Sequence, residues 1–425
     1  MSFKHKKKIL IYAHYYYPDV ASTGQILTEL AEGMSDVFDV TVICVVPSYT
    51  GKVADKYKTR KYYNENVNGV KVVRIRVPEF KKDNKKSRIK NILSYFFNAI
   101  LVTKKVGRAD YVYAISQPPV LGGLLGVWGK KRKKAKFIYN IQDFNPEQTM
   151  AVNYSKNKLL LSFLMRLDKY SCKKADKVIV VGRDMVKTLE KRFDGQKMPE
   201  YACINNWINE GETCPLARDD SRVVEFKKRY GLEDKFVIMY SGNIGLYYDL
   251  ENLMSVIRKF SEQNNCTKDG REVAFAFVGE GSMLEELKKY KQKNNLESVV
   301  FIPYQDKKDL VYSLNAGDVH WVVNAKGIKG VSVPSKCYGV MAVGKPVLGV
   351  LEQGSEARML IEHTGCGLCC EPCDYDSVLE NIRWFVDNAE SERMLEMGRC
   401  GREYLVKNLT RDISIQKYID EILNC

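Results

Sequence analysis

Short apolar runs recur along the whole chain, and each is followed by a turn and then by residues at helical spacing. Runs without polar alternation, such as residues 9–13 and 273–279, are typical of parallel strands buried on both faces of a sheet. Strands that alternate with helices form parallel sheets through right-handed crossovers. The predicted strands of the first part are residues 8–13, 39–46, 70–77, 109–115, 135–141, 175–181 and 201–204. Those of the second part are residues 273–279, 299–302, 318–323 and 346–350, preceded by a strand that begins at residue 236 and runs into a glycine turn by residue 242.

This alternation of strands and helices stops after residue 204 and begins again at residue 236, which predicts an α/β protein with two doubly wound domains. A chain of 425 residues also exceeds what one hydrophobic core usually serves. We predict two Rossmann-like domains, residues 1–205 and 206–400, that face each other across a cleft. Residues 401–425 are predicted to form a C-terminal helix that packs back towards the first domain. The predicted helices include residues 26–34, 158–173, 250–260, 283–294, 308–314, 336–343, 375–388, 391–407 and 413–424.

Positive charge is concentrated in the first half of the chain. Residues 1–200 contain 39 Lys and Arg against 18 Asp and Glu, whereas the remainder contains 28 against 34. This excess attracts anionic partners such as nucleic acid, an acidic membrane face or phosphorylated substrates, although a solvated basic surface is the plainer interpretation. No apolar run has the length of a bilayer span, and no cleavage signal follows Lys4 and its neighbouring lysines, so we predict a cytoplasmic protein.

A basic stretch leads into an aromatic-rich helix between residues 81 and 105. This pattern is typical of helices that lie on an anionic membrane, and it predicts peripheral association with the inner membrane. A core helix beside a solvated loop would show the same pattern. The cations are Lys81, Lys82, Lys85, Lys86, Arg88 and Lys90, and the apolar residues are Ile92, Leu93, Tyr95, Phe96, Phe97 and Ile100.

Four of the twelve cysteines, Cys366, Cys369, Cys370 and Cys373, lie within eight residues. Two Cys-x2-Cys pairs suggest zinc, but structural zinc sites normally place their pairs well apart so that four thiolates surround the ion. The segment is more typical of a turn entering a buried strand with free thiols. We therefore predict no metal site, and we predict structural roles for the lone His14 and His320.

Three glycine-containing turns follow predicted strands, where open α/β sheets bind their ligands. The first is Thr23-Gly24-Gln25, the second is the segment from Ser241 to Gly245, and the third contains Gly279, Glu280 and Gly281. Each is compatible with an ordinary tight turn, but the second and third open on the same edge and favour a ligand. No Gly-x-Gly-x-x-Gly follows a strand, so a dinucleotide-binding enzyme is disfavoured.

The segment from Gly327 to Gly349 is the strongest indication of a ligand. Pro334 suits the start of a helix, which would place Ser335 and Lys336 in the first turn beside a glycine loop. A hydroxyl, an ammonium and free helix amides are groups that bind a diphosphate. Helix capping next to a surface lysine is the alternative.

Together these segments resemble the family 4 retaining glycosyltransferases of the GT-B fold, especially those that build bacterial surface polysaccharides. The resemblance covers nearly the whole chain. It is carried by Tyr-x-Pro followed by Thr23-Gly24, by residues 140–147 (NIQDFNPE), 205–209 (NNWIN), 240–245 (YSGNIG) and 278–281 (VGEG), and by 333–336 (VPSK) with 341–346 (MAVGKP).

The resemblance implies a nucleotide-sugar donor, usually UDP-linked, held mainly by the C-terminal domain, and an acceptor on the N-terminal domain. It implies metal-independent transfer with retention, without a cofactor, by front-face attack. The implied diphosphate residues are Gly24, Gly242, Asn243, Ile244, Gly245, Ser335 and Lys336. The implied base and ribose residues are Gly279, Glu280, Pro303, Tyr304 and Gln305, and the donor sugar would lie against Gly330, Val331 and Val333.

The chain departs from this family at two places. Alignment puts Val331 and Gly339 where the family often has a pair of glutamates, and it puts Asn243 and Tyr248 at the usual Arg and Lys. Lys336 is therefore the expected local cation. Asp143 follows Gln142 where many members have a His-Asp-like element, so it is the predicted catalytic or acceptor-orienting carboxylate, or else a capping residue of the next loop.

Three functions remain open from the sequence. The first is a transferase that extends a lipid-linked or soluble saccharide at the anionic inner-membrane face. The second is a nucleotide-sugar epimerase of the same architecture. The third is a nucleic-acid binder that uses the basic half, but no recognised binding module or aromatic stacking platform supports it, so nucleic acid is not a predicted partner.

Overall fold

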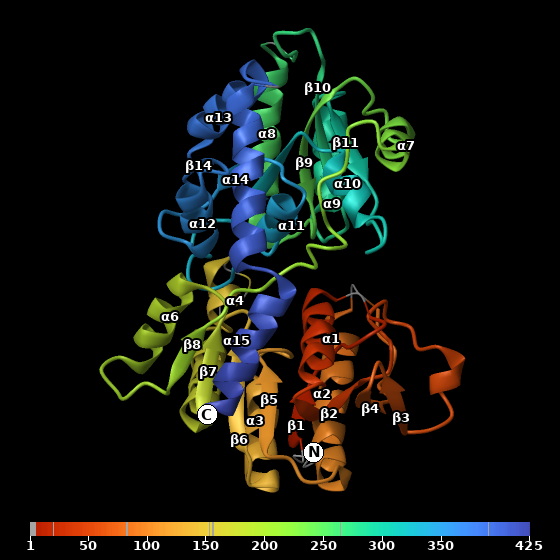
Figure 1. The fold of residues 1–425 in the computed structure, drawn as a ribbon, viewed down its shortest axis with the longest axis vertical. Helices are drawn as coiled ribbons and strands as arrows, with labels where there is room; N and C mark the ends of the chain where they lie inside the picture. Colours follow the sequence, from red (N-terminus) through yellow and green to blue (C-terminus); the bar gives the residue numbers. More distant parts are fainter. Residues whose placement is uncertain are drawn as a thin grey trace, which may run out of the picture. The chain divides into compact units, whose positions relative to one another are not determined.

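The computed structural model describes residues 6–19, 21–81, 84–152, 154, 157–263, 265–389 and 391–425 (Figure 1). Lys4 and Lys82 lie outside these ranges. The chain divides into two compact units, the first formed by Met1–Asn206 with Asp412–Cys425 and the second by Trp207–Arg411. Helix α14 (Glu392–Asn408) continues unbroken across residue 400, where we predicted a domain boundary, so residues 401–411 belong to the second unit.

The first unit is a Rossmann-like sheet of eight strands in the order β3-β4-β2-β1-β5-β6-β7-β8, and only β3 is antiparallel. The strand order reverses direction at β1 and β5, so the loops after these strands lie at the topological switch point. Its strands are β1 (Lys7–Tyr12), β2 (Phe38–Val45), β3 (Tyr62–Val67), β4 (Val70–Ile75), β5 (Tyr111–Ile115), β6 (Lys136–Ile141), β7 (Lys177–Val180) and β8 (Tyr201–Cys203).

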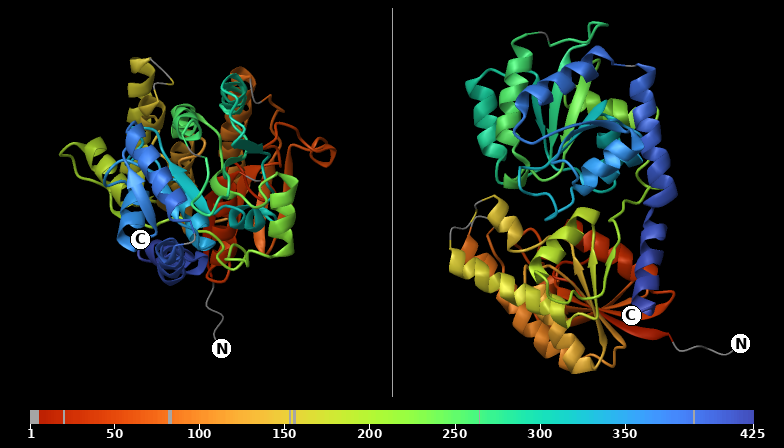
Figure 2. Two further views of the ribbon diagram at one scale, coloured as in Figure 1. Left: turned by 90° about the horizontal axis from the view of Figure 1, so that it is seen from above. Right: turned by 90° about the vertical axis from the view of Figure 1, so that its left-hand side faces the viewer.

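Helices cover both faces of this sheet. Helices α2, α3 and α5 lie side by side on one face, and α1 with the C-terminal α15 lies on the other (Figure 2). Ile415 of α15 packs against Gly33 of α1, and Tyr418 is fully buried. The helices are α1 (Ser22–Met34), α2 (Lys85–Lys105), α3 (Leu121–Lys133), α4 (Glu147–Ala151), α5 (Lys158–Lys174), α6 (Arg183–Phe193) and α15 (Arg411–Leu423), with a 3-10 turn η1 (Asp55–Tyr57).

The prediction that the first helix begins at residue 26 is wrong, because α1 begins at Ser22. The apolar periodicity starts only at Ile26, whereas the first turn is polar and small. Gly24 lies in that turn, where a Cβ would lie 3.2 Å from the carbonyl oxygen of Tyr15. Because glycine has no Cβ, the helix can start close against the loop that follows β1.

The second unit is a parallel sheet of six strands in the order β11-β10-β9-β12-β13-β14, so its switch point lies between β9 and β12. Its strands are β9 (Phe236–Ser241), β10 (Val273–Val278), β11 (Val299–Ile302), β12 (Val319–Val323), β13 (Val347–Val350) and β14 (Gly367–Cys370). Its helices, besides α14, are α7 (Ser221–Arg229), α8 (Leu250–Ser261), α9 (Leu284–Lys293), α10 (Leu310–Asn315), α11 (Lys336–Ala342), α12 (Glu356–Thr364) and α13 (Tyr375–Asp387), with a 3-10 turn η2 (Leu246–Tyr248).

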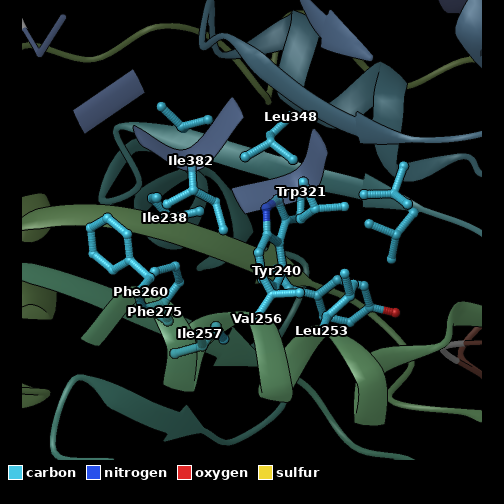
Figure 3. Close-up of a cluster of buried hydrophobic side chains, with 14 of the residues drawn as sticks. Ile238, Tyr240, Leu253, Val256, Ile257, Phe260, Phe275, Trp321, Leu348 and Ile382 are labelled. Carbon is cyan, nitrogen blue, oxygen red and sulfur yellow. The ribbon is translucent and has the colours of Figure 1, made fainter. Parts of the chain in front are cut away.

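The larger core of this unit lies between the sheet and helices α8, α9 and α13 (Figure 3). Phe275 of β10 and Trp321 of β12 point into it, whereas Ala274 and Ala276 point to the opposite face. Side chains alternate between the faces of a strand, so one strand supplies large residues to one core and small residues to the other. Within the described residues, no helix combines the length and the apolarity that crossing a bilayer requires.

A buried ion cluster holds the loop after β6 in the first unit. Arg192 of α6 forms an ion pair with Asp168 of α5. Its Nε and one Nη atom also each donate to a carboxylate oxygen of Glu147, and both of these distances are 2.6 Å. Asp168 also accepts a hydrogen bond from the hydroxyl of Tyr139 at 2.6 Å. Arg192 further donates to the carbonyl oxygen of Asn145 at 2.9 Å. The guanidinium thus joins two helices to the loop that carries Asp143.

Replacing Asp168 with Ala should lower the free energy of unfolding of the first unit by roughly 3 kcal/mol, because Arg192 would stay buried with a carboxylate missing. Hydrogen exchange of peptides from β6 and α5 measures this change. Lys71→Ala is the control in the same unit, since its pair with Asp39 is 62% exposed on the lysine side and should contribute about 0–1 kcal/mol. Equal effects from both variants would contradict the structural role of the cluster.

Candidate functional site

The candidate site of the second unit lies at the carboxyl ends of β9, β10 and β12. The turns after β9 and β10 are packed on each other through glycines. Gly242 (φ +142°) donates to the carbonyl oxygen of Val278 at 2.9 Å, and Ile244 donates to that of Glu280 at 2.8 Å. A Cβ on Gly279 (φ +140°) would lie 2.0 Å from the carbonyl oxygen of Gly242. Only glycine allows the two turns to approach this closely.

Two amides in the β9 turn are left available by this packing. The amides of Gly242 and Ile244 are used within the fold, but within the described ranges the amides of Asn243 and Gly245 donate to no other group. The carbonyl oxygen of Asn243 accepts a hydrogen bond from the hydroxyl of Tyr240 at 2.5 Å. The turn is therefore held in place from β9 while it keeps two donors for a ligand.

Lys336, the first residue of α11, reaches across to this turn. Its Nζ donates to the hydroxyl of Tyr240 at 2.8 Å and lies over the ring of Tyr248 at 3.5 Å from the centroid. A Cβ on Gly242 would lie 2.4 Å from Cε of Lys336, so the lysine stem runs directly over that glycine. In the part of the chain that the structure describes, no carboxylate pairs with this ammonium.

Burial lowers the pKa of Lys336 to about 7. Desolvation penalises the charged form of a lysine, and no anionic side chain offsets that penalty here. An anion bound beside Nζ would supply the missing interaction. Tyr240 and Tyr248 contact the ammonium of Lys336 and so belong to the site, although neither is among the predicted site residues. The signals in the sequence are that Tyr240 opens the 240–245 motif and that Tyr248 stands where the family usually has a lysine.

The loop between β12 and α11 carries the other predicted residues of this region. Glu352, after β13, accepts hydrogen bonds from the amides of Gly327 at 2.9 Å and Lys329 at 3.0 Å and so fixes the loop. Gly330 has φ +72° and is buried, and Val331 is also buried, whereas Val333 is half-buried. Ser335 is exposed and precedes α11, and its side chain makes no capping hydrogen bond.

The residues predicted for the base and ribose follow β10 and β11. Glu280, Pro303 and Tyr304 are exposed, and the side-chain Nε2 of Gln305 donates to the carbonyl oxygen of Pro303 at 2.7 Å. Strands β10 and β11 are neighbours in register, with Val278 opposite Ile302. These residues therefore lie on the same sheet edge as the β9 turn, one strand away from it after β10 and two strands away after β11.

The first unit presents a second set of polar loops at its own switch point. Thr23 donates to the side-chain oxygen of Gln117 at 2.7 Å, which joins the start of α1 to the loop after β5. Asp143 follows β6 and is half-buried, and its amide donates to the hydroxyl of Ser116 at 3.3 Å. Gly24, in the first turn of α1, and Asp143, in the loop after β6, thus lie at the same edge of this sheet.

Gln142 belongs to the scaffold rather than to an exposed site. Its side-chain Nε2 donates to Oδ1 of Asn140 at 2.6 Å, and its side-chain Oε1 accepts a hydrogen bond from Nδ2 of Asn206 at 2.7 Å. Asn140 in turn donates to the hydroxyl of Tyr418 at 3.2 Å. These buried side-chain amides attach two segments to the sheet: Asn206, which ends the first stretch of this unit, and Tyr418 of helix α15.

The lone histidines and the cysteine segment have the structural positions that the sequence predicted. His14 and His320 are buried, and burial lowers the pKa of each to about 4. His320 is hydrogen-bonded to the carbonyl oxygen of Leu314 at 2.9 Å. Cys366 precedes β14 and Cys370 ends it, both buried, whereas Cys373 is exposed.

A cavity of about 680 Å³ opens at the other end of the first sheet, where strands β1, β2 and β4 begin. Lys8, Lys71 and Arg108 line it together with apolar strand residues. None of the predicted site residues contributes to its wall. The candidate sites therefore lie in the loops at the carboxyl ends of the strands rather than in this cavity.

Two protein-family models match the chain, one on each unit. The model described as "Glycosyl transferase 4-like domain" matches residues 23–199, and the model described as "Glycosyl transferases group 1" matches residues 223–403. The chain belongs to the family 4 glycosyltransferases. Together the two models include the β9 turn, Lys336 and Asp143 of this glycosyltransferase.

Curated relatives agree with this assignment. The probable glycosyltransferase WbjE of Pseudomonas aeruginosa is 26% identical over 352 residues, which are 80% of this chain and 82% of that protein. The putative colanic acid biosynthesis glycosyl transferase WcaI of Escherichia coli K12 is 24% identical and covers 98% of this chain and 99% of its own.

Solved structures show the same fold. Sucrose-phosphate synthase from Thermosynechococcus elongatus superimposes with a TM-score of 0.77 at 13% identity over 99% of both chains. Alr3699/HepE from Anabaena, in complex with UDP and glucose, has a TM-score of 0.71 at 14% identity over 98% of this chain and 99% of that one. The predicted GT-B fold, with two Rossmann-like units, is confirmed.

Gly279→Ala should destabilise the glycosyltransferase more than Gly270→Ala does. Both glycines have positive φ, at +140° and +88°, but a Cβ on Gly270 would meet nothing within 4 Å. The backbone strain of about 1–3 kcal/mol is therefore shared, and the clash with Gly242 is added only at Gly279. Urea unfolding measures the difference, and hydrogen exchange should rise in the 242–245 turn of Gly279→Ala alone. Indistinguishable variants would contradict the close approach of the two turns.

Proposed function

We propose that this glycosyltransferase moves a sugar from a UDP-sugar to a lipid-linked or soluble saccharide during the synthesis of a bacterial surface polysaccharide. The single observation that carries the donor assignment is Lys336, held by two tyrosines beside the glycine turns and without a carboxylate partner among the described residues. The names of WbjE and WcaI support the glycosyltransferase and polysaccharide parts, and the HepE complex with UDP supports the nucleotide.

In this proposal the diphosphate contacts Lys336 and the amides of Asn243 and Gly245. The nucleoside extends along the sheet edge towards Glu280 and Gln305, and the sugar lies against the loop that contains Gly330. A cation and two fixed amides stabilise the negative charge that grows on the leaving diphosphate. This arrangement supplies from the protein the positive charge that a metal ion would otherwise provide, so we propose transfer without a metal.

We propose that the reaction retains the anomeric configuration. The acceptor hydroxyl oxygen forms its bond to C1 of the donor sugar on the face from which the diphosphate oxygen departs. The pair of electrons of the broken C1–O bond goes to the diphosphate, and an oxygen of the departing phosphate takes the proton of the acceptor hydroxyl. Asp143, on the first unit, orients that hydroxyl.

The first unit also meets the anionic surface of the inner membrane in this proposal. Its excess of Lys and Arg supports this contact, and so does helix α2, which begins with Lys85, Lys86 and Arg88. One predicted residue is corrected here, because Tyr95 is fully buried and does not contribute to the outer face of α2. A lipid-linked acceptor would then be presented to the same unit that carries Asp143.

A UDP-sugar should raise the melting temperature of the wild-type protein, and Lys336→Met should weaken its binding by roughly 10- to 100-fold, the cost of a lost charged hydrogen bond. Lys268→Met, an exposed lysine on the loop before β10, is the matched control and should bind as the wild type does. A thermal-shift titration against a panel of nucleotide sugars measures both. No response to any UDP-sugar would overturn the donor assignment.

The same titration has a predicted pH dependence. Below pH 7 the ammonium of Lys336 is present before the donor binds, whereas above pH 7 binding must first add a proton, because burial lowers the pKa to about 7. Affinity should therefore fall by up to about tenfold for each pH unit above 7. Lys336→Met should show a flat profile, and a wild-type profile that is equally flat would contradict this role of the lysine.

Asp143→Asn should lower kcat by roughly 100-fold, the usual cost of a misplaced reacting group, because the acceptor hydroxyl would lose the carboxylate that orients it. Donor binding should stay unchanged, since the donor loops belong to the second unit. Asp55→Asn, at a side chain that is 97% exposed, is the control. Initial rates with a saccharide acceptor measure turnover, and the thermal shift with UDP-sugar measures binding. Full activity of Asp143→Asn would leave Asp143 as a capping residue only.

A further inference from the structure

Exposed large apolar side chains are concentrated on two helices of the first unit. Among the described residues, twenty such side chains are exposed: eight lie on α2 and α5, and two more precede α5, Met150 on α4 and Tyr154 after it. These ten are Ile89, Leu93, Phe97, Leu101, Met150, Tyr154, Leu159, Leu160, Phe163 and Tyr170. Contiguous apolar patches on a soluble protein mark places where another apolar surface binds.

On α2 the exposed residues form one continuous stripe. Ile89, Leu93, Phe97 and Leu101 recur every four residues, and Phe97 is 59% exposed. The opposite side of the helix is buried against the sheet through Tyr95 and other residues. The core therefore accounts for one side of α2 and leaves a second apolar side without a partner in the described structure.

Helix α5 repeats this arrangement with larger exposure. Leu159 is 85% exposed and Phe163, one turn later, is 57% exposed, whereas Leu161 and Cys172 on the inner side are buried. Leucine and phenylalanine at these positions contribute nothing to the core of the first unit. The sequence pattern predicts α5 only as a helix, without a surface role.

The two helices belong to one surface. Helix α3 packs against both of them on the same face of the sheet (Figure 2). Glycines such as Gly126, where a Cβ would lie 2.0 Å from the ring of Phe137, let α3 lie close to the sheet between its neighbours. The ammonium of Lys85, at the start of α2, also lies 4.7 Å from the ring centroid of Tyr154, just before α5.

The charge of this surface identifies its partner. Helices α2 and α5 together carry eleven Lys and Arg, and their only acidic residue, Asp168, is buried in its pair with Arg192. A second copy of the chain would bring two sets of cations together, which disfavours a symmetric dimer. Phosphates of a nucleic acid would neutralise the cations but would leave the leucines and phenylalanines exposed. An anionic lipid bilayer satisfies both the charge and the apolar stripes.

We propose that α2 and α5 form a two-helix face that inserts its apolar side chains into an anionic bilayer, with α5 contributing an anchor independent of α2. The inference rests on the membrane contact proposed above and specifies its second element. It requires neither the donor nor the acceptor to be known.

Vesicle flotation with the full-length protein tests the proposal. Wild type should float with phosphatidylcholine vesicles that contain phosphatidylglycerol and much less with phosphatidylcholine alone. Leu159→Ser/Phe163→Ser on α5 and Ile89→Ser/Phe97→Ser on α2 should each reduce the partition coefficient at least tenfold, even at low salt. Leu395→Ser/Val406→Ser is the matched control, because these residues of α14 are also exposed, at 56% and 43%, and the double variant should float like wild type.

Thermal shift with a UDP-sugar shows whether each variant is folded and keeps its donor site, so failure of the donor assignment is distinguishable from failure of the membrane face. As a second measurement, Phe163→Trp and Phe97→Trp should each be quenched by brominated lipids. The proposal would be overturned if the α5 variant floated as the wild type does, or if brominated lipids did not quench the tryptophan fluorescence of Phe163→Trp. The proposal would also be overturned if the wild type did not float with vesicles but formed a dimer in light scattering, and if the α5 variant no longer formed that dimer.

Discussion

Burial of the strands on both faces is the constraint on which the rest of this structure depends. Strands such as β10 are apolar on both sides, so polar groups that act on a ligand have room only where strands end. The carboxyl ends of parallel strands lie at one edge, which gathers the turns after β9 and β10 beside the start of α11. The glycines of these turns then decide how close the segments come, and hence where the ammonium of Lys336 lies.

The sheets could be predicted from the sequence because buried parallel strands leave a plain signature. Strand β11 was predicted at its observed bounds, and β10 within one residue. Strand β3 was missed, since it is short, polar and antiparallel, although the Asn68-Gly69 pair, with φ of 49° and 86°, is a hairpin turn that joins it to β4. Helix α3 was missed because its four glycines weaken the helical signal, yet close packing on the sheet requires them.

The candidate site was less accessible to sequence analysis. Lys336 could be singled out by its position at a helix start, but its partners Tyr240 and Tyr248 come from elements almost a hundred residues away. Glu352 fixes the loop of Gly330 through backbone amides and has no recognisable motif. Likewise, periodicity shows that α5 has two apolar sides but not which of them the fold covers. Long-range contacts decide these points, and a single sequence does not encode them in any local pattern.

Helix α15 has a consequence for how the chain reaches its native state. The first sheet takes its strands from residues 1–206, but part of one face is covered by a helix from residues 412–425. While Ile415, Tyr418 and Ile419 are still inside the ribosome, the sheet positions that they cover are bare. The second unit, by contrast, is contiguous and can fold as it emerges. The first unit can therefore be completed only after the second has emerged, and a nascent chain stalled before residue 412 would hold an incompletely covered sheet for chaperones to shield.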